Sequence, residues 1–211
     1  LEVVVADGGS SDDTSGLARA AGARVVAAPR GRARQLQAGV DALAAAGEGG
    51  PEVVLFLHAD TRLPDGWGWA VQSALEAPDA ADAVGGAFRF AFAQDVVASL
   101  GERLELAFVQ TIARLRVAIF GLPYGDQGLF ARREVLAAIG GVPQVELMED
   151  LDLVRALRSR GRLLRLPLVA TTSPRRHCER GVLRTACLHA WALGAWSLGM
   201  DRNRIRARLG R

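Results

Sequence analysis

The sequence of 211 residues contains no lysine, so its 26 basic residues are all arginines. Against 23 carboxylates they leave a net charge of +3, and they are spread along the chain. Aromatic residues are 6% of the chain and are not interleaved with the arginines, which argues against a nucleic-acid-binding surface. Because arginine is the better bidentate partner of phosphate and carboxylate, the composition remains compatible with a phosphorylated substrate.

Cysteine is also scarce, and the two cysteines, Cys178 and Cys187, lie in one C-terminal region. They do not make a disulfide framework and have no zinc-type spacing, so we expect buried free thiols in a reducing compartment. The sequence has no signal-peptide pattern and no run of the ~18 apolar residues that a membrane span needs. The length predicts one domain, or one domain with an appendage, and the apolar half of the residues is typical of a globular protein. We expect a cytoplasmic location, with the inner face of the membrane as a further option.

The central feature of the sequence is a short apolar run, Val53 to Leu57, that is followed by His58, Ala59 and Asp60. Its length and its β-branched residues predict a strand that is covered on both faces. Ligands of open α/β sheets bind beyond the carboxyl ends of the strands, which is where His58 and Asp60 stand. A carboxylate beside an imidazole suits a divalent cation that also holds phosphate oxygens. Capping of the turn before Pro64 explains Asp60 equally well, so both interpretations stay open.

A similar pattern begins the chain, where the apolar run from Leu1 to Ala6 ends in Asp7 and Gly8. Paired glycines permit a tight turn there, and the hydroxyl and acidic residues at 10–14 predict a capped helix over Ser15–Ala21. Capping accounts for the acidic residues inside the turn. Asp7 stands before the turn, at the end of the strand, so we expect it to have a function.

Arginines mark the start of a helix that we expect to run from about Arg32 to Ala46, after a short strand over Arg24–Ala28. Basic residues at a helix start oppose the helix dipole, and an anionic ligand at that end would explain Arg32. Solvated surface arginines explain the pattern as well.

Three carboxylates, Glu149, Asp150 and Asp152, lie in the first turn of another helix, which we expect to continue to Arg160. The helix dipole favours negative charge at this end and accounts for any one of them. Three carboxylates beside a cation site repel one another unless a metal or an arginine offsets them. We therefore expect at least one of the three to be catalytic.

The remaining elements follow from hydrophobic periodicity. We expect helices over Trp67–Leu75 and Arg132–Ile139, a half-exposed strand over Ala83–Phe92 and an edge strand over Leu163–Ala170.

Two long apolar stretches allow a choice between core and membrane surface. The stretch Val96–Phe120 predicts one helix or a helix pair, which we place in the core, with a lipid-facing surface as the alternative. The stretch Val182–Met200 carries Trp191 and Trp196 and precedes a basic tail, so packing on the core and contact with a membrane stay open.

The order of these motifs resembles that of the family 2 glycosyltransferases of the GT-A fold, from Leu1 to about Leu168. The resemblance is carried by four motifs: Val3–Asp12, Leu57–Asp60, Gly125–Gln127 and Glu149–Asp150. Several segments are similar to a bacterial subgroup named rSAM/selenodomain-associated glycosyltransferases. The resemblance implies an α/β, Rossmann-like, mostly parallel central sheet flanked by helices. It places a GT-A domain over residues 1–170 and a C-terminal loop, helix and basic tail over residues 171–211.

The same resemblance implies donor-binding roles near the start of the chain. Asp7 and Gly8 would hold the nucleoside of a nucleotide-sugar donor, UDP- or GDP-linked, and Arg32 would face its phosphates. Asp60 would be the last acidic residue of a DxD-type motif that binds Mn²⁺ or Mg²⁺. His58 stands at the first acidic position of that motif, which is a departure from the family pattern, and His177 is a further candidate ligand of metal or phosphate.

The resemblance also implies the residues that act on the acceptor. Asp126 and Gln127 would line the sugar or acceptor pocket. Asp150 would be the general base, with Glu149 as its neighbour or substitute. The reaction would invert the anomeric centre, on a hydroxyl or carboxyl acceptor that includes lipid-like ones, with peripheral membrane contact through the C-terminal helix.

The start of the chain departs from the family pattern, and two other functions stay open. Family members have an extra strand, loop and helix before the strand that ends at Asp7, so we expect such a segment upstream of Leu1. The alternatives are a nucleotidyltransferase, whose glycine-rich phosphate loop the sequence lacks, and a non-catalytic sugar-nucleotide-binding module. The enzyme interpretation requires Asp7, Asp60 and Asp150 to converge at one rim of the sheet.

Overall fold

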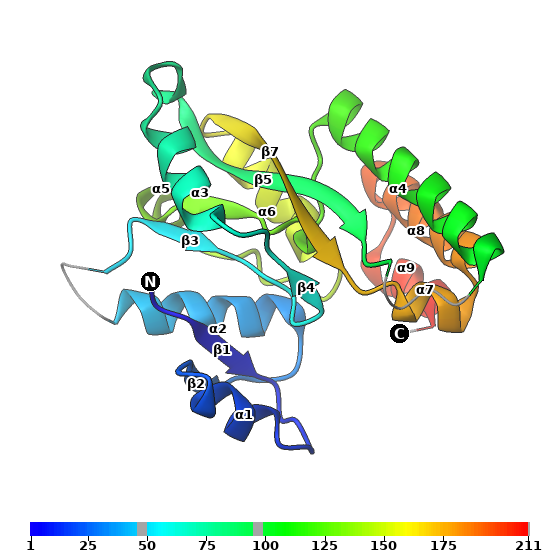
Figure 1. The fold of residues 1–211 in the computed structure, drawn as a ribbon, viewed down its shortest axis with the longest axis horizontal. Helices are drawn as coiled ribbons and strands as arrows, with labels where there is room; N and C mark the ends of the chain where they lie inside the picture. Colours follow the sequence, from blue (N-terminus) through cyan, green and yellow to red (C-terminus); the bar gives the residue numbers. More distant parts are fainter. Residues whose placement is uncertain (46–49, 95–98, 211) are drawn as a thin grey trace. The chain divides into compact units, whose positions relative to one another are not determined.

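The computed structural model describes residues 1–45, 50–94 and 99–210 as an α/β protein (Figure 1). The predicted helix end at Ala46, the predicted helix start at Val96 and the last residue of the tail, Arg211, lie outside these residues. Contacts divide the chain into two units of interleaved segments. Unit 1 comprises Leu1–Phe56, Asp82–Gly86 and Phe130–Leu163, and unit 2 comprises Leu57–Ala81, Ala87–Leu129 and Leu164–Arg211. This division does not test the predicted boundary at residue 170.

Unit 1 begins with two parallel strands and two helices. They are β1 (Val4–Asp7), α1 (Thr14–Ala20), β2 (Arg24–Ala27) and α2 (Arg32–Ala44). The register runs from Val4 opposite Arg24 to Asp7 opposite Ala27, and α2 packs on both strands. The predicted elements are confirmed here with small shifts of their ends, because glycine and proline punctuate each turn.

Unit 1 also contains an antiparallel group of strands. Its elements are β3 (Val53–Leu55), the first residues of β5 (Ala83–Phe92), β6 (Phe130–Arg132), α5 (Arg133–Ala138) and α6 (Glu149–Arg158). Strand β6 pairs antiparallel with β3 and with β5. A Cβ atom at Gly85 would lie 2.2 Å from the Phe130 carbonyl oxygen, so the β5–β6 approach requires glycine.

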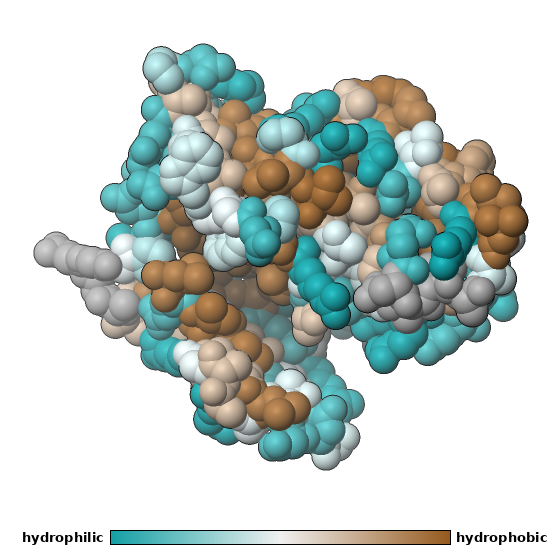
Figure 2. All heavy atoms as spheres, viewed as in Figure 1, coloured by the Kyte–Doolittle hydropathy of each residue, from teal (hydrophilic) through white to brown (hydrophobic). Residues whose placement is uncertain are grey.

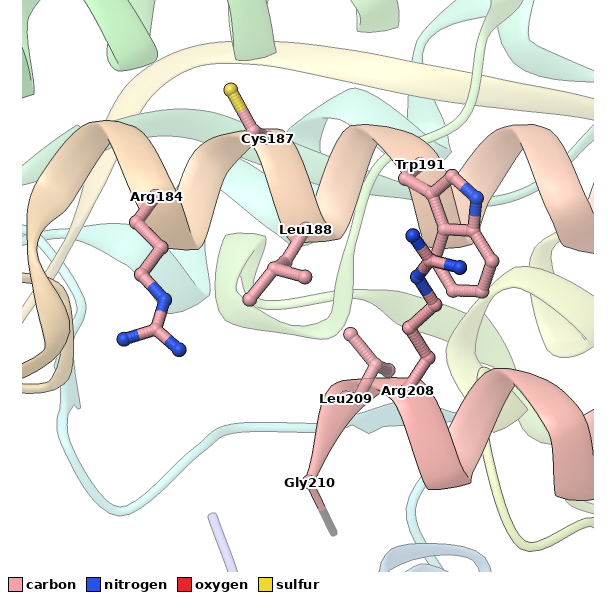
Figure 3. Close-up of a pocket in the computed structure, with 7 residues that line it drawn as sticks. All are labelled: Arg184, Cys187, Leu188, Trp191, Arg208, Leu209 and Gly210. Atoms are coloured by element: carbon pink, nitrogen blue, oxygen red, sulfur yellow. The ribbon is translucent and has the colours of Figure 1, made fainter.

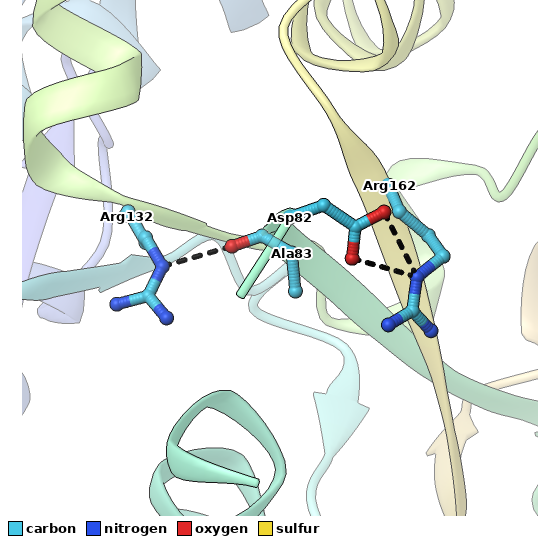
Figure 4. A network of polar contacts seen from close by, with 4 residues as sticks. All are labelled: Asp82, Ala83, Arg132 and Arg162. Atoms are coloured by element: carbon cyan, nitrogen blue, oxygen red, sulfur yellow. Dashed lines mark hydrogen bonds and ion pairs between the residues drawn. The ribbon is translucent and has the colours of Figure 1, made fainter. Parts of the chain in front are cut away.

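Arginines hold the ends of these strands through carbonyl and carboxylate oxygens (Figure 4). The Nε atom of Arg132 donates to the Ala83 carbonyl oxygen at 2.8 Å. The Nε atom of Arg162, at the start of β7, donates to Asp82 at 3.1 Å. Each bond connects the beginning of β5 to another strand.

The strand order of the five-stranded sheet is β3-β6-β5-β7-β4, and β1 and β2 form a separate two-stranded sheet. The pairs β3–β6, β5–β6 and β4–β7 are antiparallel, so the predicted mostly parallel arrangement is wrong for these strands. Short local connections and burial patterns do not determine strand direction, which is why the sequence misled here. The α/β fold with a central sheet and flanking helices is confirmed.

Unit 2 contains the rest of β5 and β7 and most of the long helices. Its elements include β4 (Thr61–Arg62), α3 (Trp67–Glu76), the 3₁₀ turns η1 (Pro78–Ala80) and η2 (Gly125–Gln127), α4 (Leu100–Phe120), β7 (Arg162–Thr172), α7 (Arg175–Arg180), α8 (Val182–Ser197) and α9 (Arg202–Leu209). Strand β5 is buried at nearly every residue, not half-exposed as predicted. Strand β7 lies between β5 and β4 rather than at the edge. In the described register, β4 pairs with Thr171 and Thr172 and does not reach Pro167. The proline, which has no N–H to donate, is therefore not opposite β4.

The helices of unit 2 enclose a small core made by Phe90, Phe92, Leu106 and Val182. The placement of residues 96–120 wholly in the core is wrong, because α4 buries one side and exposes apolar side chains on the other. Ser99 begins α4 with a capping box that includes Glu102. In the part of the chain that the structure describes, no helix combines the length and apolar character needed to cross a membrane.

Candidate functional site

The carboxyl ends of β1 and β2 and the start of α2 surround a cavity of about 570 Å³ in unit 1. Parallel pairing brings both strand ends to one edge, where α/β sheets bind their ligands. The lining residues are Asp7, Gly8, Gly9, Ser10, Ser11, Asp12, Arg30, Gly31, Arg32 and Gln35. The structure thus brings together three of the predicted donor-binding residues, Asp7, Gly8 and Arg32.

The Asp7 carboxylate is held by the turn that follows it. Its Oδ1 atom accepts hydrogen bonds from the Ser10 hydroxyl at 2.6 Å and from the Ser10 backbone N–H at 3.1 Å. Its Oδ2 atom accepts a bond from the Ser15 hydroxyl at 3.3 Å. The Ser10 hydroxyl is the main reason why the pKa of Asp7 lies below its ordinary value of 3.8. Asp7 is therefore an ionised acceptor that points at the cavity edge.

Asp12 lines the cavity and also holds the start of α1. The Thr14 hydroxyl and backbone N–H both donate to its Oδ1 atom, and the hydroxyl bond chiefly lowers the pKa of Asp12. The predicted capping role thus has support at Asp12, whereas Asp13, the N-cap residue of α1, makes no side-chain cap.

Two further residues of the cavity, Arg30 and Gln35, are not among the predicted site residues. Arg30 donates from Nε to the Gly8 carbonyl oxygen and from Nη2 to that of Gly9, both at 3.2 Å. Gln35 donates to the Ala6 carbonyl oxygen at 3.0 Å. These bonds fix the glycine turn against the start of α2. The signal in the sequence was the arginine-rich stretch at 30–34, but the sequence does not show which arginine contacts the turn.

Arg32 is the first residue of α2 and lies beside a buried carboxylate. Gly31 precedes it with φ 133°, a value that favours glycine, and no side chain caps the helix start. The Nη1 atom of Arg32 lies 3.9 Å from Oε1 of Glu149, whose side chain is 4% exposed. A helix start with an arginine beside it suits an anion at this edge of the cavity. Arg32 also offsets the charge of Glu149.

The acidic helix α6 begins with a strained residue. Met148 precedes it with φ 61°, a left-handed conformation that is uncommon outside glycine. The conformation fixes the direction of the following residues, Glu149 and Asp150. Asp150 is half-buried, and its Oδ1 atom accepts from the Leu151 backbone N–H at 2.9 Å. The role of Asp150 as the general base stays a prediction.

The predicted metal-binding turn belongs to unit 2. The Thr61 N–H donates to the His58 carbonyl oxygen at 3.0 Å, which closes a turn that exposes Asp60. The backbone oxygen of Asp60 accepts from the Ser173 N–H at 2.9 Å, while the Thr61 and Thr172 hydroxyls bond to each other at 2.7 Å. The backbone of Asp60 is therefore fixed, and its side chain faces solvent. Asp7 and Asp150 belong to unit 1, so the convergence of the three carboxylates stays a prediction.

Gln127 in the turn η2 has an orphaned polar atom. The side chain is 2% exposed, and its Oε1 atom has no hydrogen-bond partner among the described residues. A buried acceptor without a donor is costly unless a ligand or water supplies one. Asp126 is its neighbour in the same turn. Their predicted place in a sugar or acceptor pocket stays a prediction.

His177 is packed among aromatic rings. Its ring lies 4.9 Å from that of Phe92 and 5.7 Å from that of His189, edge to face in both cases. Burial lowers the pKa of His177 below its ordinary value of 6.5. Packing explains this residue without a metal, and its role as a ligand stays a prediction.

Comparison with known proteins gives one family and several similar structures. Residues 1–140 match the family model described as glycosyl transferase family 2. The chain is similar to glucosyl-3-phosphoglycerate synthase from Mycobacterium tuberculosis, solved in complex with Mn²⁺, UDP and glucosyl-3-phosphoglycerate, at 22% identity and a TM-score of 0.56. That match covers 95% of this chain and 70% of the other.

A second similar structure is mannosyl-3-phosphoglycerate synthase from Rubrobacter xylanophilus, at 18% identity and a TM-score of 0.52, with 96% of this chain and 66% of the other covered. No curated protein matches the sequence. At these identities the structural likeness shows the fold, while the family model covers well over half of the chain. The chain therefore belongs to glycosyl transferase family 2.

Proposed function

We propose that this family 2 glycosyltransferase moves a sugar from a nucleoside diphosphate donor to a hydroxyl or carboxyl group of an acceptor. The observation that carries the proposal is the cavity in unit 1, which is lined by the ionised Asp7 together with Arg30 and Arg32. The carboxylate suits the hydroxyl and N–H donors of a nucleoside, and the arginines with the helix start suit a diphosphate. The similar glucosyl-3-phosphoglycerate synthase was solved with UDP and also with UDP-glucose, which favours UDP over GDP as the nucleotide.

The donor set of the chain fits a divalent cation that the substrate also binds. The described residues contain no cluster of three or more histidine, cysteine or carboxylate side chains. Mg²⁺ and Mn²⁺ commonly take one or two protein carboxylates and fill their other positions with phosphates and water. We assign Asp60 as that ligand and His58, on the same turn, as a second one for Mn²⁺. When bound, the cation would offset the charge of the departing diphosphate.

Asp150 is the proposed general base. It is half-buried, ionisable and placed by the strained Met148 at the start of α6. A carboxylate in hydrogen-bonding reach of an acceptor hydroxyl takes its proton as the oxygen attacks the anomeric carbon. Attack from the face opposite the leaving group inverts that carbon. Glu149 is paired with Arg32 and is therefore a positioning residue, or the substitute base.

Asp126 and Gln127 are the proposed contacts to the sugar or acceptor. The orphaned Gln127 Oε1 atom would accept a hydrogen bond from a substrate hydroxyl. We further propose the rSAM/selenodomain-associated subgroup and a lipid-like acceptor. We also propose that the protein is cytoplasmic and lies at the inner membrane face. Helix α8, which contains two tryptophans, would make the peripheral contact.

Calorimetry tests the donor site most directly. UDP and GDP are titrated with and without Mn²⁺ into the wild type, into Asp7→Asn, and into Asp13→Asn, an exposed residue of the same turn that is the matched control. We expect binding to weaken about tenfold in Asp7→Asn and to stay unchanged in Asp13→Asn. Equal affinity in all three proteins would remove the assignment of Asp7.

Transfer assays test the chemistry separately. A donor screen by mass spectrometry identifies the sugar, and Asp150→Asn is then expected to lower turnover by about a hundredfold or more without loss of nucleotide binding. Metal affinity in Asp60→Ala reports the ligand assignment. Metal-dependent nucleotide binding without any transfer would instead indicate a non-catalytic binding module.

A further inference from the structure

Helix α4 exposes a continuous apolar face. Its members are separated by three or four residues, lie on one side of the helix and are each at least 49% exposed. They are Leu100, Leu104, Phe108, Ile112, Leu115 and Ile119, here called the α4 stripe. Figure 2 shows hydrophobic side chains gathered on the right-hand side, over the helix that Figure 1 labels α4.

The opposite side of α4 is firmly packed, so the stripe is not the result of a loosely placed helix. Leu106 is fully buried against Phe90, Phe92 and Val182. The Nε atom of Arg114 donates to the Phe90 carbonyl oxygen at 3.3 Å. These contacts fix the rotation of the helix and direct the stripe outward. Monomeric proteins seldom expose a long apolar patch that has no partner.

The adjoining helices are strongly basic. Helix α8 packs against α4, α7 and α9. Residues 175–211 carry nine arginines and two carboxylates, Glu179 and Asp201. A surface of this charge is repelled by a second copy of itself and attracted by anionic lipid headgroups, each arginine near the membrane adding about 1 kcal/mol.

A cavity between α8 and α9 is lined by both arginines and apolar side chains (Figure 3). It has a volume of about 460 Å³, and Arg184, Leu188 and Leu209 point into it. The Arg208 guanidinium lies 5.1 Å from the centre of the Trp191 ring. Tryptophan and arginine over apolar side chains are typical of a membrane interface, where the ring and the aliphatic stems contact lipid and the charges face the headgroups.

We propose that the α4 stripe docks the protein on an anionic lipid bilayer. The stripe enters the boundary between headgroups and acyl chains, and the arginines of α7, α8 and α9 supply the electrostatic attraction. The proposal goes beyond the transfer reaction, because docking requires neither donor nor acceptor. It adds α4 to the lipid contact proposed above for α8, and the α4 stripe itself contains no charged residue.

Co-sedimentation with vesicles tests the proposal with the full chain. The vesicles contain phosphatidylcholine alone or phosphatidylcholine with phosphatidylglycerol. We expect the wild type to bind the anionic vesicles at least about tenfold more strongly than the neutral ones, and added salt to weaken the binding. The variant Leu104→Gln/Phe108→Gln/Ile112→Gln is expected to lose at least about tenfold of this affinity, since it takes three apolar side chains out of the lipid.

The matched control is Leu17→Gln on α1, because Leu17 is 67% exposed and Leu104 is 65% exposed. The control is expected to bind vesicles as the wild type does. UDP calorimetry in the absence of lipid is expected to be the same for all three proteins, which separates docking from donor binding.

Failure of the wild type to bind anionic vesicles would overturn the proposal, as would equal binding by the triple variant. A dimer in solution that the triple variant abolishes, together with no vesicle binding, would assign the stripe to a second copy instead and would also overturn it.

Discussion

Asp7 shows how one carboxylate serves both a turn and a ligand site. An ionised carboxylate has about four lone-pair positions, and Asp7 accepts four hydrogen bonds from Ser10 and Ser15. The turn therefore fixes the direction of Asp7, and a nucleoside would take the place of one of the two longer bonds to Oδ2, both at 3.3 Å. Asp12, five residues later, accepts hydrogen bonds from the backbone N–H and the hydroxyl of Thr14. The two residues are alike in sequence and differ in the groups that donate to them.

The variant Ser10→Ala tests the link between Ser10 and the charge of Asp7. The hydroxyl stabilises the ionised form, so its removal is expected to raise the pKa of Asp7 toward 3.8. In the wild type this stabilisation is present above about pH 3.8 and is lost as the pH falls through the lowered pKa of the folded state. Wild type and variant should therefore differ in unfolding free energy at neutral pH and approach each other in acid.

Carboxyl NMR titration gives the pKa of Asp7, and urea unfolding at several pH values gives the free energies. Ser11→Ala, at the next position of the turn, is the control. A pKa of Asp7 that is the same in Ser10→Ala and in the wild type would contradict the assignment.

The contribution of the Arg32–Glu149 ion pair to stability can be tested, because Arg32 is half-exposed and Glu149 is buried. Arg32→Gln leaves the Glu149 carboxylate without that cation, and we expect it to lower the unfolding free energy by about 1 kcal/mol. Adding Glu149→Gln should restore part of this loss, which a double-mutant cycle by urea unfolding measures. If Arg32 also faces donor phosphates, UDP affinity falls in Arg32→Gln and not in Glu149→Gln. Strictly additive free energies would show that the pair does not interact.

At the scale of elements, local patterns predicted most helices and strands but not their partners. The ends of β5 and the start of α2 follow from apolar periodicity and glycine punctuation. The antiparallel pairs of β6 and the inner position of β7 depend on contacts distant in sequence. In α4 both sides are apolar, so periodicity does not show which side is buried. In the site the acidic motifs were evident, whereas the bonds from Arg30 and Gln35 required the folded chain.

Replacement of glycine by alanine is expected to have opposite effects on the unfolding free energy at Gly85 and at Gly39. At Gly85 a Cβ atom would meet the backbone of Phe130 and Ala131 at 2.2 and 2.8 Å, and backbone does not move aside at low cost. We expect Gly85→Ala to lower the unfolding free energy by about 2 kcal/mol or more. At Gly39, inside α2, a Cβ atom would meet nothing within 4 Å, and Gly39→Ala is expected to add about 0.5–1 kcal/mol. Urea unfolding of both variants checks the two signs, and a neutral Gly85→Ala would show that β5 and β6 are not this close.

At the scale of the whole molecule, the small net charge conceals an uneven distribution. Residues 1–174 contain 17 arginines and 21 carboxylates, while the remaining 37 residues contain nine arginines and two carboxylates. The basic C-terminal part is nevertheless integral to unit 2. Val182, Trp196 and Ile205 are all buried there, and Val182 belongs to the core of β5 and α4. Charge alone would describe this part as a tail, and packing shows that it completes a core.

Removal of residues 175–211 tests whether these helices complete that core. The truncated chain loses the buried Val182, Trp196 and Ile205 and uncovers Phe92 and Leu106, so we expect loss of cooperative thermal unfolding in unit 2 and binding of a hydrophobic dye. The full-length variant Arg204→Gln lowers the charge at an exposed position and should unfold as the wild type does, which separates core from charge. A truncated chain that unfolds cooperatively at the wild-type temperature and binds no dye would show the reverse. The predicted division near residue 170 would then be a true domain boundary, and the helices beyond it would be an accessory to a core that is complete without them.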